Sequence, residues 1–183
     1  MTAPRDVAPA TTPGPAAVVL RHPTEEDQPR IAAVIDWWFG GQHVRHLVVR
    51  SWFRHFGSTS WLALGGDAPE AGPVGVLIGH GSPDRPAEAI IHLVAVDPNQ
   101  RRRGIGRALV EAFVAEAARS GRTVGRAVAW PGEPGATSFF RAMGFSPDAG
   151  PGSRNLYGTP AFADYEGAGE DRIVFVRDLP TPG

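Results

Sequence analysis

The chain has 183 residues, of which 42% are hydrophobic and 20% are charged, and these values are those of one ordinary soluble globular domain with a full core. The formal net charge is −1, which excludes a global positive field that would attract nucleic acid or an anionic membrane. There is no cysteine, so disulfides, thiolate metal ligands and a cysteine nucleophile are excluded. All 18 basic residues are arginine, so lysine chemistry is excluded as well.

Residues 1–15 are rich in Ala, Pro and Thr, and we expect a disordered tail ahead of a single domain at 16–183. This tail has no apolar core of the kind found in secretory signals. No apolar run reaches the roughly 20 residues of a membrane span. We therefore expect a cytoplasmic protein without membrane contact, and the Ala, Gly, Pro and Arg usage is typical of a GC-rich bacterial genome.

The first half of the domain is predicted to begin with a short strand at 16–21 and then a helix, for which Thr24 is the N-cap. Apolar positions between 44 and 56 predict a second amphipathic helix that ends at Gly57. Three strands follow, the third of which is the strongest in the chain and is stopped by Asp97-Pro98. These strands are expected within the ranges 59–66, 72–81 and 88–96.

The second half is predicted to contain a long helix, a strand, a short helix and a final strand, in that order. Their expected ranges are 104–120, 123–130, 135–145 and 171–179. The order βααβββαβαβ predicts one α/β domain in which helices pack on a mixed sheet.

The sequence "RRRGIGRALV" at 101–110 opens a helix directly after the strongest strand. A helix start presents unpaired N–H groups and the positive end of the helix dipole, and glycines at 104 and 106 let the backbone approach a ligand. This pattern predicts a pyrophosphate site. A Rossmann site needs a third glycine and a later acidic residue, and a Walker loop needs a lysine, and all three are absent.

The segment "VAVDP" followed by [QR]-x-x-G-x-[GA] resembles the acyl-CoA loop of the GNAT acyltransferase superfamily. "RHPTEEDQPRI" at 21–31 resembles the opening of its first helix, and "GATSFFRAMGF" at 135–145 resembles a late segment of its fold. The resemblance covers residues 16–178 and includes a bacterial subgroup. It implies an α/β fold with a mixed, splayed β-sheet flanked by about four helices, and CoA in the V between the fourth and fifth strands.

The resemblance also implies which residues bind acetyl-CoA. Backbone groups at 94–96 would contact the pantetheine and the acyl carbonyl, and amides at 101–107 would hold the pyrophosphate. Phe140 stands where the family usually carries a tyrosine that faces the CoA sulfur, and we expect it to pack against the pantetheine. The expected cofactor-binding residues are Val94, Ala95, Val96, Arg101, Arg102, Arg103, Gly104, Ile105, Gly106, Arg107 and Phe140.

Because phenylalanine cannot donate a proton, Phe140 departs from the family pattern. Three explanations remain open: water protonates the leaving thiolate, another hydroxyl replaces the tyrosine, or the protein binds acyl-CoA without efficient turnover. The alternative hydroxyls are those of Ser138, Tyr157 and Tyr165.

The two-residue period of a strand would place Glu88, Ile90, His92, Val94 and Val96 on one side of the sheet. His92 would then lie beside the cofactor segment, and an imidazole with a pKa near 6.5 is suited to accept the ammonium proton of an acceptor. The alternative is a histidine that only makes structural hydrogen bonds. Glu88 is the second candidate for the base, or otherwise a solvated edge residue.

The acceptor side is expected to be walled by aromatic and acidic residues, although buried tryptophans and solvated acids would explain the same pattern. The aromatic residues are Trp37, Trp38, Phe39, Tyr157 and Tyr165, and the acidic residues are Asp164, Glu166, Glu170 and Asp171. Histidines at 43, 46 and 55 match no metal-binding spacing, so no metal is expected.

Together these features predict an N-acetyltransferase that moves an acetyl group from acetyl-CoA to a primary amine, by direct transfer in a ternary complex. The expected partner is a small-molecule amine, with no nucleic acid, and the protein would be a monomer or homodimer. The alternatives are a protein N-terminal or lysine acetyltransferase, a catalytically weak acyl-CoA-binding sensor, and a nucleic-acid-binding module that uses the arginine run.

Overall fold

The computed structural model describes residues 18–66 and 72–180, so the tail expected at 1–15 lies outside the described residues. The helices are α1 (Gln28–Trp38), α2 (Arg50–Phe56), α3 (Ile105–Arg119) and α4 (Pro134–Ala142). The strands are β1 (Val18–Arg21), β2 (Trp61–Gly65), β3 (Pro73–Gly81), β4 (Glu88–Val96), β5 (Val124–Ala129), β6 (Ser146–Pro147), β7 (Arg154–Leu156), β8 (Thr159–Ala161) and β9 (Ile173–Asp178).

The main sheet has seven strands in the order β1-β2-β3-β4-β5-β9-β6. All neighbouring pairs are antiparallel except β4 and β5, which are parallel. The predicted order βααβββαβαβ is confirmed, and β6 and the β7–β8 hairpin are added to it. Strands of two and three residues are too short to show a two-residue hydrophobic period, which is why the sequence did not predict them.

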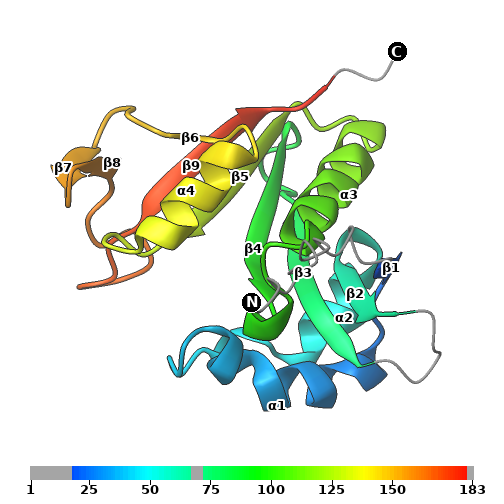
Figure 1. The fold of residues 1–183 in the computed structure, drawn as a ribbon. Helices are drawn as coiled ribbons and strands as arrows, with labels where there is room; N and C mark the ends of the chain where they lie inside the picture. Colours follow the sequence, from blue (N-terminus) through cyan, green and yellow to red (C-terminus); the bar gives the residue numbers. More distant parts are fainter. Residues whose placement is uncertain (1–17, 67–71, 181–183) are drawn as a thin grey trace, which may run out of the picture.

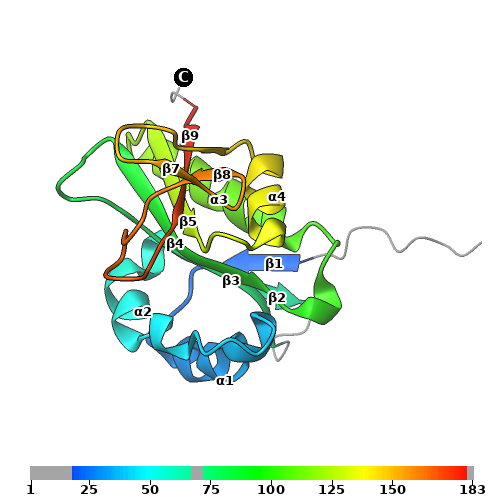
Figure 2. The same ribbon diagram turned by 90° about the vertical axis from the view of Figure 1, so that its left-hand side faces the viewer.

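Helices cover both faces of the sheet (Figures 1 and 2), and a hydrophobic cluster lies on each face. Side chains of α3 and α4, such as Phe113 and Phe140, pack on one face. Side chains of α1 and α2, such as Ile35 and Phe53, pack on the other. Within the described ranges, no helix combines the length and apolar composition that crossing a bilayer requires.

The opening of the first helix is explained by contacts among Arg21, Thr24 and Asp27. Thr24 is the N-cap of a 3₁₀ turn at Glu25–Asp27, as predicted. Its backbone N–H donates to the Asp27 carboxylate at 2.8 Å, and the Arg21 guanidinium pairs with the same carboxylate at 2.7 Å. This ion pair fastens the end of β1 to the start of α1.

The prediction of a single helix over 44–56 is wrong. The chain instead forms a 3₁₀ turn at Arg45–Leu47, an extended residue at Val49 (φ −91°, ψ 152°) and then α2. Val44, Val48 and Phe53 are nevertheless all buried in the cluster under α1. Their spacing imitates a helix because they share one buried surface, while the β-branched pair Val48–Val49 favours extended backbone.

The two central parallel strands separate beyond their first half. Register pairs join Glu88–Ile91 of β4 to Val124–Ala127 of β5, and within the described chain the ladder between these strands ends there. Residues 93–96 of β4 pair only with β3, and β4 and β5 diverge beyond the paired residues (Figure 1). This geometry confirms the predicted splay between the fourth and fifth strands.

Strand β4 contains a bulge at His92. Ile78 of β3 pairs with Leu93, but the next residue, Gly79, pairs with Ile91, so His92 is one extra residue in the ladder. A bulge of this kind rotates the strand locally and changes which face each following side chain occupies.

The bulge overturns the expectation that Glu88, Ile90, His92, Val94 and Val96 all lie on one side of the strand. Val94 and Val96 pack on the α3 face of the sheet, whereas the His92 ring lies on the opposite face, stacked on Trp52 of α2. A two-residue period holds only for an unbroken strand. The bulge therefore leaves the His92 side chain on one side of β4 and the side chains of Val94 and Val96 on the other.

Candidate active site

The helix start that follows β4 is built by backbone conformation. Asp97 accepts a hydrogen bond from the Asn99 N–H at 2.8 Å and caps a 3₁₀ turn at Pro98–Gln100. Arg102 (φ 64°) and Gly104 (φ 81°) then turn the chain into α3. Gly104 is the N-cap and offers no side chain, so the amides of residues 105–107 are the free donors of the first helical turn.

The two glycines of this loop have different roles. A Cβ on Gly104 would meet nothing within 4 Å, so glycine is needed there for its positive φ. A Cβ on Gly106 would lie 2.9 Å from the Phe139 ring and 3.6 Å from a Val96 methyl group. Gly106 therefore allows the start of α3 to lie against α4 and β4. The space that a side chain at position 106 would occupy is taken by Phe139 and Val96.

The arginines of the loop also differ from one another. Arg101 donates to the Trp38 carbonyl at 2.5 Å and to the Val96 carbonyl at 3.4 Å, so its side chain ties the loop to the end of α1. Arg103 donates to the Gln100 side chain, and Arg107 pairs with Glu111 at 3.5 Å. The guanidinium groups of Arg101, Arg103 and Arg107 are therefore engaged by protein atoms, and phosphate binding by the backbone amides of the loop stays a prediction.

This surface fits a pyrophosphate attached to an extended chain. The first turn of α3 offers free amides and the positive end of a 15-residue helix. The open edge of β4 at residues 92–96 runs directly into this loop. An extended molecule could therefore lie along the edge of β4, with its phosphates at the start of α3. Contacts at 94–96 and 101–107 stay predictions.

On the opposite face of β4, His92 is held in one orientation. Its Nε2 lies 3.1 Å from the Leu47 carbonyl, and its ring stacks on Trp52 with centroids 4.4 Å apart. Because a carbonyl can only accept, Nε2 carries the hydrogen and Nδ1 carries the lone pair of the neutral ring. The bulge and α2 together orient a nitrogen base.

Burial lowers the pKa of His92 below its ordinary value. The hydrogen bond to Leu47 and the negative charge of Glu166 oppose this shift, while His80 adds to it. The lowered pKa keeps the imidazole neutral at pH 7, and a neutral imidazole is the form that accepts a proton.

Glu88, the second candidate for the base, lies at the closed end of the splay. Its carboxylate pairs with Arg126 of β5 at 2.9 Å and with Arg85 at 3.7 Å, and Arg126 also pairs with Asp148 at 3.3 Å. His92 lies four positions further along the strand, or about 13 Å away. This position favours a structural role in joining β4 to β5, and a role in proton transfer stays a prediction.

Phe140 lies in the core of the α4 side and exposes 4% of its surface. Its ring centroid is 5.0 Å from that of Phe175, 5.3 Å from Phe139 and 5.7 Å from Phe145. A contact with pantetheine stays a prediction, and the structure supplies a packing role instead. Of the alternative hydroxyls, Tyr157 is 82% exposed at the β7–β8 turn and Tyr165 is 47% exposed.

The aromatic residues expected on the acceptor side divide into several environments. Trp38 is a core residue and Trp37 is exposed. Phe39 contacts Trp130, at the end of β5, edge to face with centroids 6.4 Å apart. Trp52 and Trp130 are two further aromatic residues on this side, and no sequence motif marks either of them.

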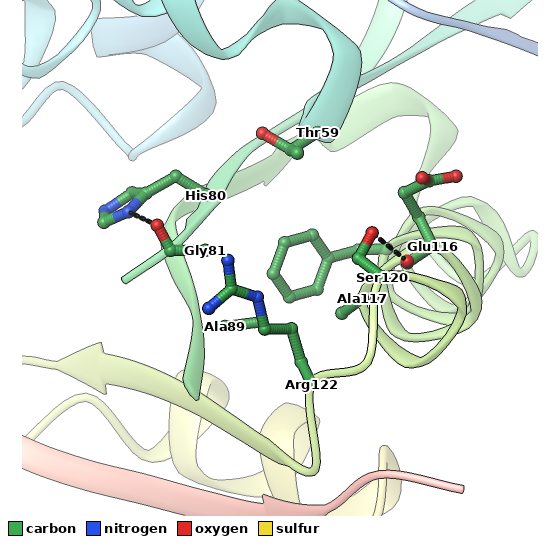
Figure 3. A pocket seen from close by; sticks show the side chains of 9 residues that line it. Thr59, His80, Gly81, Ala89, Glu116, Ala117, Ser120 and Arg122 are labelled. Atoms are coloured by element: carbon green, nitrogen blue, oxygen red, sulfur yellow. Dashed lines mark hydrogen bonds between the residues drawn. The ribbon is translucent and has the colours of Figure 1, made fainter. Parts of the chain in front are cut away.

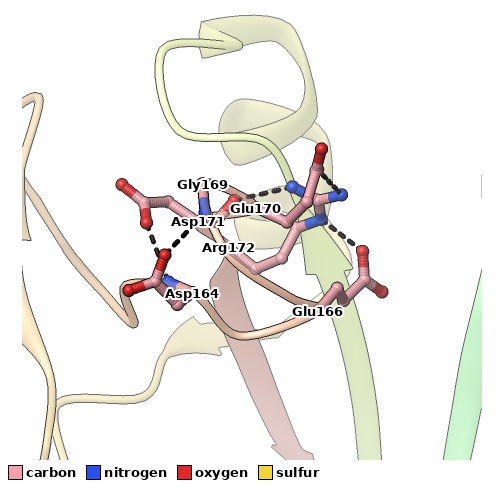
Figure 4. A network of polar contacts seen from close by, with 6 residues as sticks. All are labelled: Asp164, Glu166, Gly169, Glu170, Asp171 and Arg172. Carbon is pink, nitrogen blue, oxygen red and sulfur yellow. Dashed lines mark hydrogen bonds and ion pairs between the residues drawn. The ribbon is translucent and has the colours of Figure 1, made fainter.

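The acidic residues at 164–171 mainly organise their own loop (Figure 4). The buried guanidinium of Arg172 pairs with Glu166 at 2.6 Å and with Glu170 at 2.7 Å. Asp171 accepts from the Asp164 N–H at 2.9 Å, and Asp164 accepts from the Gly169 N–H at 2.6 Å. The acidic residues are therefore not simply solvated, because two of them pair with a buried arginine. No sequence pattern had indicated a role for Arg172.

A separate cavity of about 50 Å³ lies near the beginning of β4, between Ala89, His80 and Arg122 (Figure 3). Its volume suits one or two water molecules. The cavity is too small for a substrate and lies away from the open end of the splay.

A mixed sheet that splays between its central parallel strands, with a glycine-led helix start beside the opening, defines the class of protein as an acyltransferase fold. Residues 21–145 match the model of the acetyltransferase (GNAT) family. Since this match covers more than half of the chain, the protein belongs to the GNAT acetyltransferase family.

Solved structures show the same fold. Ard1 from Thermoplasma volcanium is 18% identical, with a TM-score of 0.71 over 90% of this chain and 99% of that one. The diaminobutyrate acetyltransferase EctA from Paenibacillus lautus, in complex with L-2,4-diaminobutyric acid and coenzyme A, is 20% identical, with a TM-score of 0.66 over 92% and 98%. The putative acetyltransferase yncA from Salmonella typhimurium, with acetyl-CoA, is 14% identical, with a TM-score of 0.63 over 92% and 97%. No curated protein sequence matches the chain.

Proposed function

We propose that this protein transfers the acetyl group of acetyl-CoA to a primary amine of a small molecule, by direct attack in a ternary complex. One observation carries the proposal: the opening between β4 and β5 has a phosphate-type helix start at one end and an oriented imidazole on the acceptor face. Neighbours of the same fold that hold coenzyme A and acetyl-CoA support the choice of donor.

The donor side is assigned to backbone groups. When bound, acetyl-CoA supplies an activated thioester. Amides at 105–107 would hold its phosphates, and the open edge of β4 would align its extended arm. The backbone N–H at Val94, which the family resemblance suggests, would stabilise the negative charge that develops on the thioester oxygen.

On the acceptor side, the amine must lose a proton before it can attack. His92 would accept that proton at Nδ1, directly or through one water molecule. The hydrogen bond to Leu47 and the stack on Trp52 keep Nδ1 as the free nitrogen. The neutral state that burial favours makes His92 ready to act at pH 7.

The leaving thiolate would take its proton from water. Phe140 has no proton to donate, and the structure places its ring among three other phenylalanines. A thiol with a pKa of about 8.5 is a good leaving group, so the reaction does not require a protein acid. Water is therefore preferred over Ser138, Tyr157 or Tyr165.

Two features of the acceptor side support a small acceptor over a polypeptide. The Phe39–Trp130 contact joins the end of α1 to the end of β5. The segment 162–172 is held to the end of β5 by Arg172, which stacks on Trp130. A polypeptide acceptor would need a continuous channel on this side of the splay. These contacts place side chains across it, which leaves room for a smaller acceptor.

The test is CoA thiol release from acetyl-CoA with a panel of diamines, amino acids, amino sugars, N-terminal peptides and lysine peptides. We expect kcat/KM for the best small amine to exceed that for the best peptide by about tenfold or more, a difference of about 1.4 kcal/mol in transition-state binding. Turnover restricted to peptides would show a protein acetyltransferase. Binding of CoA without turnover of any amine would show the sensor.

A further inference from the structure

Arg172, directly before β9, carries a buried charge that the proposed reaction does not use. Its side chain is 8% exposed. Nε pairs with Glu166 at 2.6 Å, Nη2 pairs with Glu170 at 2.7 Å, and Nη1 donates to the Asp171 carbonyl at 2.8 Å (Figure 4). A buried guanidinium is tolerated only when its donors are satisfied in this way, so the segment 164–171 is arranged around it.

The same guanidinium reaches the open end of the splay. Its Cζ lies 5.0 Å from the centroid of the Trp130 ring, within the range of a cation–π contact. Trp130 in turn meets Phe39, the C-cap residue of α1, at 6.4 Å and 87°. The contacts from Arg172 through Trp130 to Phe39 therefore join the β9 side of the molecule to the α1 side, across the region where β4 and β5 have separated.

The backbone of Arg172 closes the segment into a loop. Its N–H donates to the Phe162 carbonyl at 2.9 Å, and the Phe162 N–H donates back to Arg172 at 2.8 Å. Glu166 belongs to the loop so closed, and its negative charge partly opposes the lowering of the His92 pKa by burial. Arg172 thus determines the position of side chains on the acceptor face and touches none of the donor loop at 97–107.

We propose that Arg172 is a positioning residue for the acceptor: it holds the segment 162–172 and the Trp130 ring as one wall beside His92, and so determines amine affinity separately from acetyl-CoA affinity. The proposal rests on the proposed function and extends it to acceptor selection. The competing explanation is that Arg172 contributes only to the stability of the fold.

The experiment compares the Arg172→Gln variant with a matched control, Arg177→Gln. Arg177, in β9, shares two types of contact with Arg172, a stack on an aromatic ring and a hydrogen bond to a backbone carbonyl: it stacks on Phe145 at 5.8 Å and donates to the Met143 carbonyl at 2.7 Å. It pairs opposite Gly125, at the closed end of the splay. Arg177→Gln should lower the melting temperature and leave both KM values unchanged.

For Arg172→Gln, steady-state kinetics should show KM for the amine raised by about tenfold, since a charged hydrogen-bond network is lost. KM for acetyl-CoA should change less than about twofold. Arg172→Lys keeps the charge but not the planar fork, and it should fall between the wild type and the Gln variant. Equal rises in both KM values, or the same pattern in Arg177→Gln, would overturn the positioning role.

A second measurement does not depend on turnover. Hydrogen exchange at the Phe162 and Arg172 amides should be faster in Arg172→Gln than in the wild type and unchanged in Arg177→Gln. If no amine is acetylated by the wild type, the proposed function fails, while exchange still tests whether Arg172 holds the loop. Equal exchange in the wild type and Arg172→Gln would refute the proposal by itself.

Discussion

At the scale of single residues, His92 is where the structure changes the chemical interpretation most. Its ring lies on the α1–α2 face, where Leu47 and Trp52 orient it, and the bulge puts the side chains of Val94 and Val96 on the other face. A base on this face, opposite the side chains of Val94 and Val96, can meet an acceptor that approaches from the side away from α3. Under the proposed function, the extra residue in β4 would therefore put the acceptor and the donor on different faces of the strand.

Replacement of His92 by Gln tests this role. Glutamine can still donate to the Leu47 carbonyl but cannot accept a proton, so kcat/KM at neutral pH should fall by about 10²- to 10⁴-fold. The acid limb of the pH–rate profile should disappear, and in the wild type that limb should lie below pH 6.5 because burial lowers the pKa of His92. An unchanged profile would show that His92 is structural.

The lowered pKa of His92 also predicts a dependence of stability on pH. The folded state favours the neutral ring, so this contribution is fully present above the ordinary pKa of about 6.5 and is lost as the pH falls through the lower folded value. Thermal unfolding between pH 7 and 5 should therefore show a smaller loss of melting temperature in His92→Gln than in the wild type. Equal losses in the two proteins would contradict the shift.

At the scale of elements, the start of α3 depends on close packing as much as on helix polarity. Gly106 lies where the helix meets Phe139 of α4 and Val96 of β4. Because these three elements border the splay, a change in their separation should alter the donor site. Arg101 adds a further tie from the same loop to the end of α1.

The Gly106→Ala variant tests this packing. The added methyl group would lie 2.9 Å from the Phe139 ring, so unfolding free energy should fall by about 1–3 kcal/mol, and acetyl-CoA should bind more weakly. Gly135→Ala in α4 is the control, since its methyl group meets no atom within 4 Å, and it should be neutral or stabilise by up to about 1 kcal/mol. Chemical denaturation and calorimetric titration measure both effects, and equal behaviour of the two variants would argue against a packing role for Gly106.

At the scale of the whole molecule, the net charge is close to zero. This charge favours a local CoA site at the start of α3 over an extended nucleic-acid-binding surface. A ligand that binds only the folded state stabilises it by mass action, by about 2.7 kcal/mol at one hundred times its Kd. For a chain of this size each kcal/mol is worth about 2–4 °C. Free CoA at that concentration should therefore raise the melting temperature by about 5–10 °C, whereas single-stranded DNA should leave it unchanged, and the reverse result would favour the nucleic-acid module.

The sequence alone was sufficient for the elements whose patterns are local. The strand at 88–96, the helix that follows Gly104 and the N-cap at Thr24 each depend on neighbouring residues, and the structure confirms them. The order of elements was predicted for the same reason, whereas the splay between the fourth and fifth strands was implied by the resemblance to the GNAT superfamily. The free backbone amides of the loop were predictable because the first turn of every helix has N–H groups without a partner in the helix.

Only the tertiary structure decided what depends on contacts between distant segments. The bulge at His92 results from the register between β3 and β4, and no strand period reveals it. The break before α2 and the burial of Phe140 were decided by the clusters against which they pack. Arg172 joins carboxylates to a tryptophan 42 positions earlier, Trp130. The proposed donor site thus depends on local backbone geometry. The proposed acceptor face forms only when β3, α2, β5 and the segment before β9 pack together.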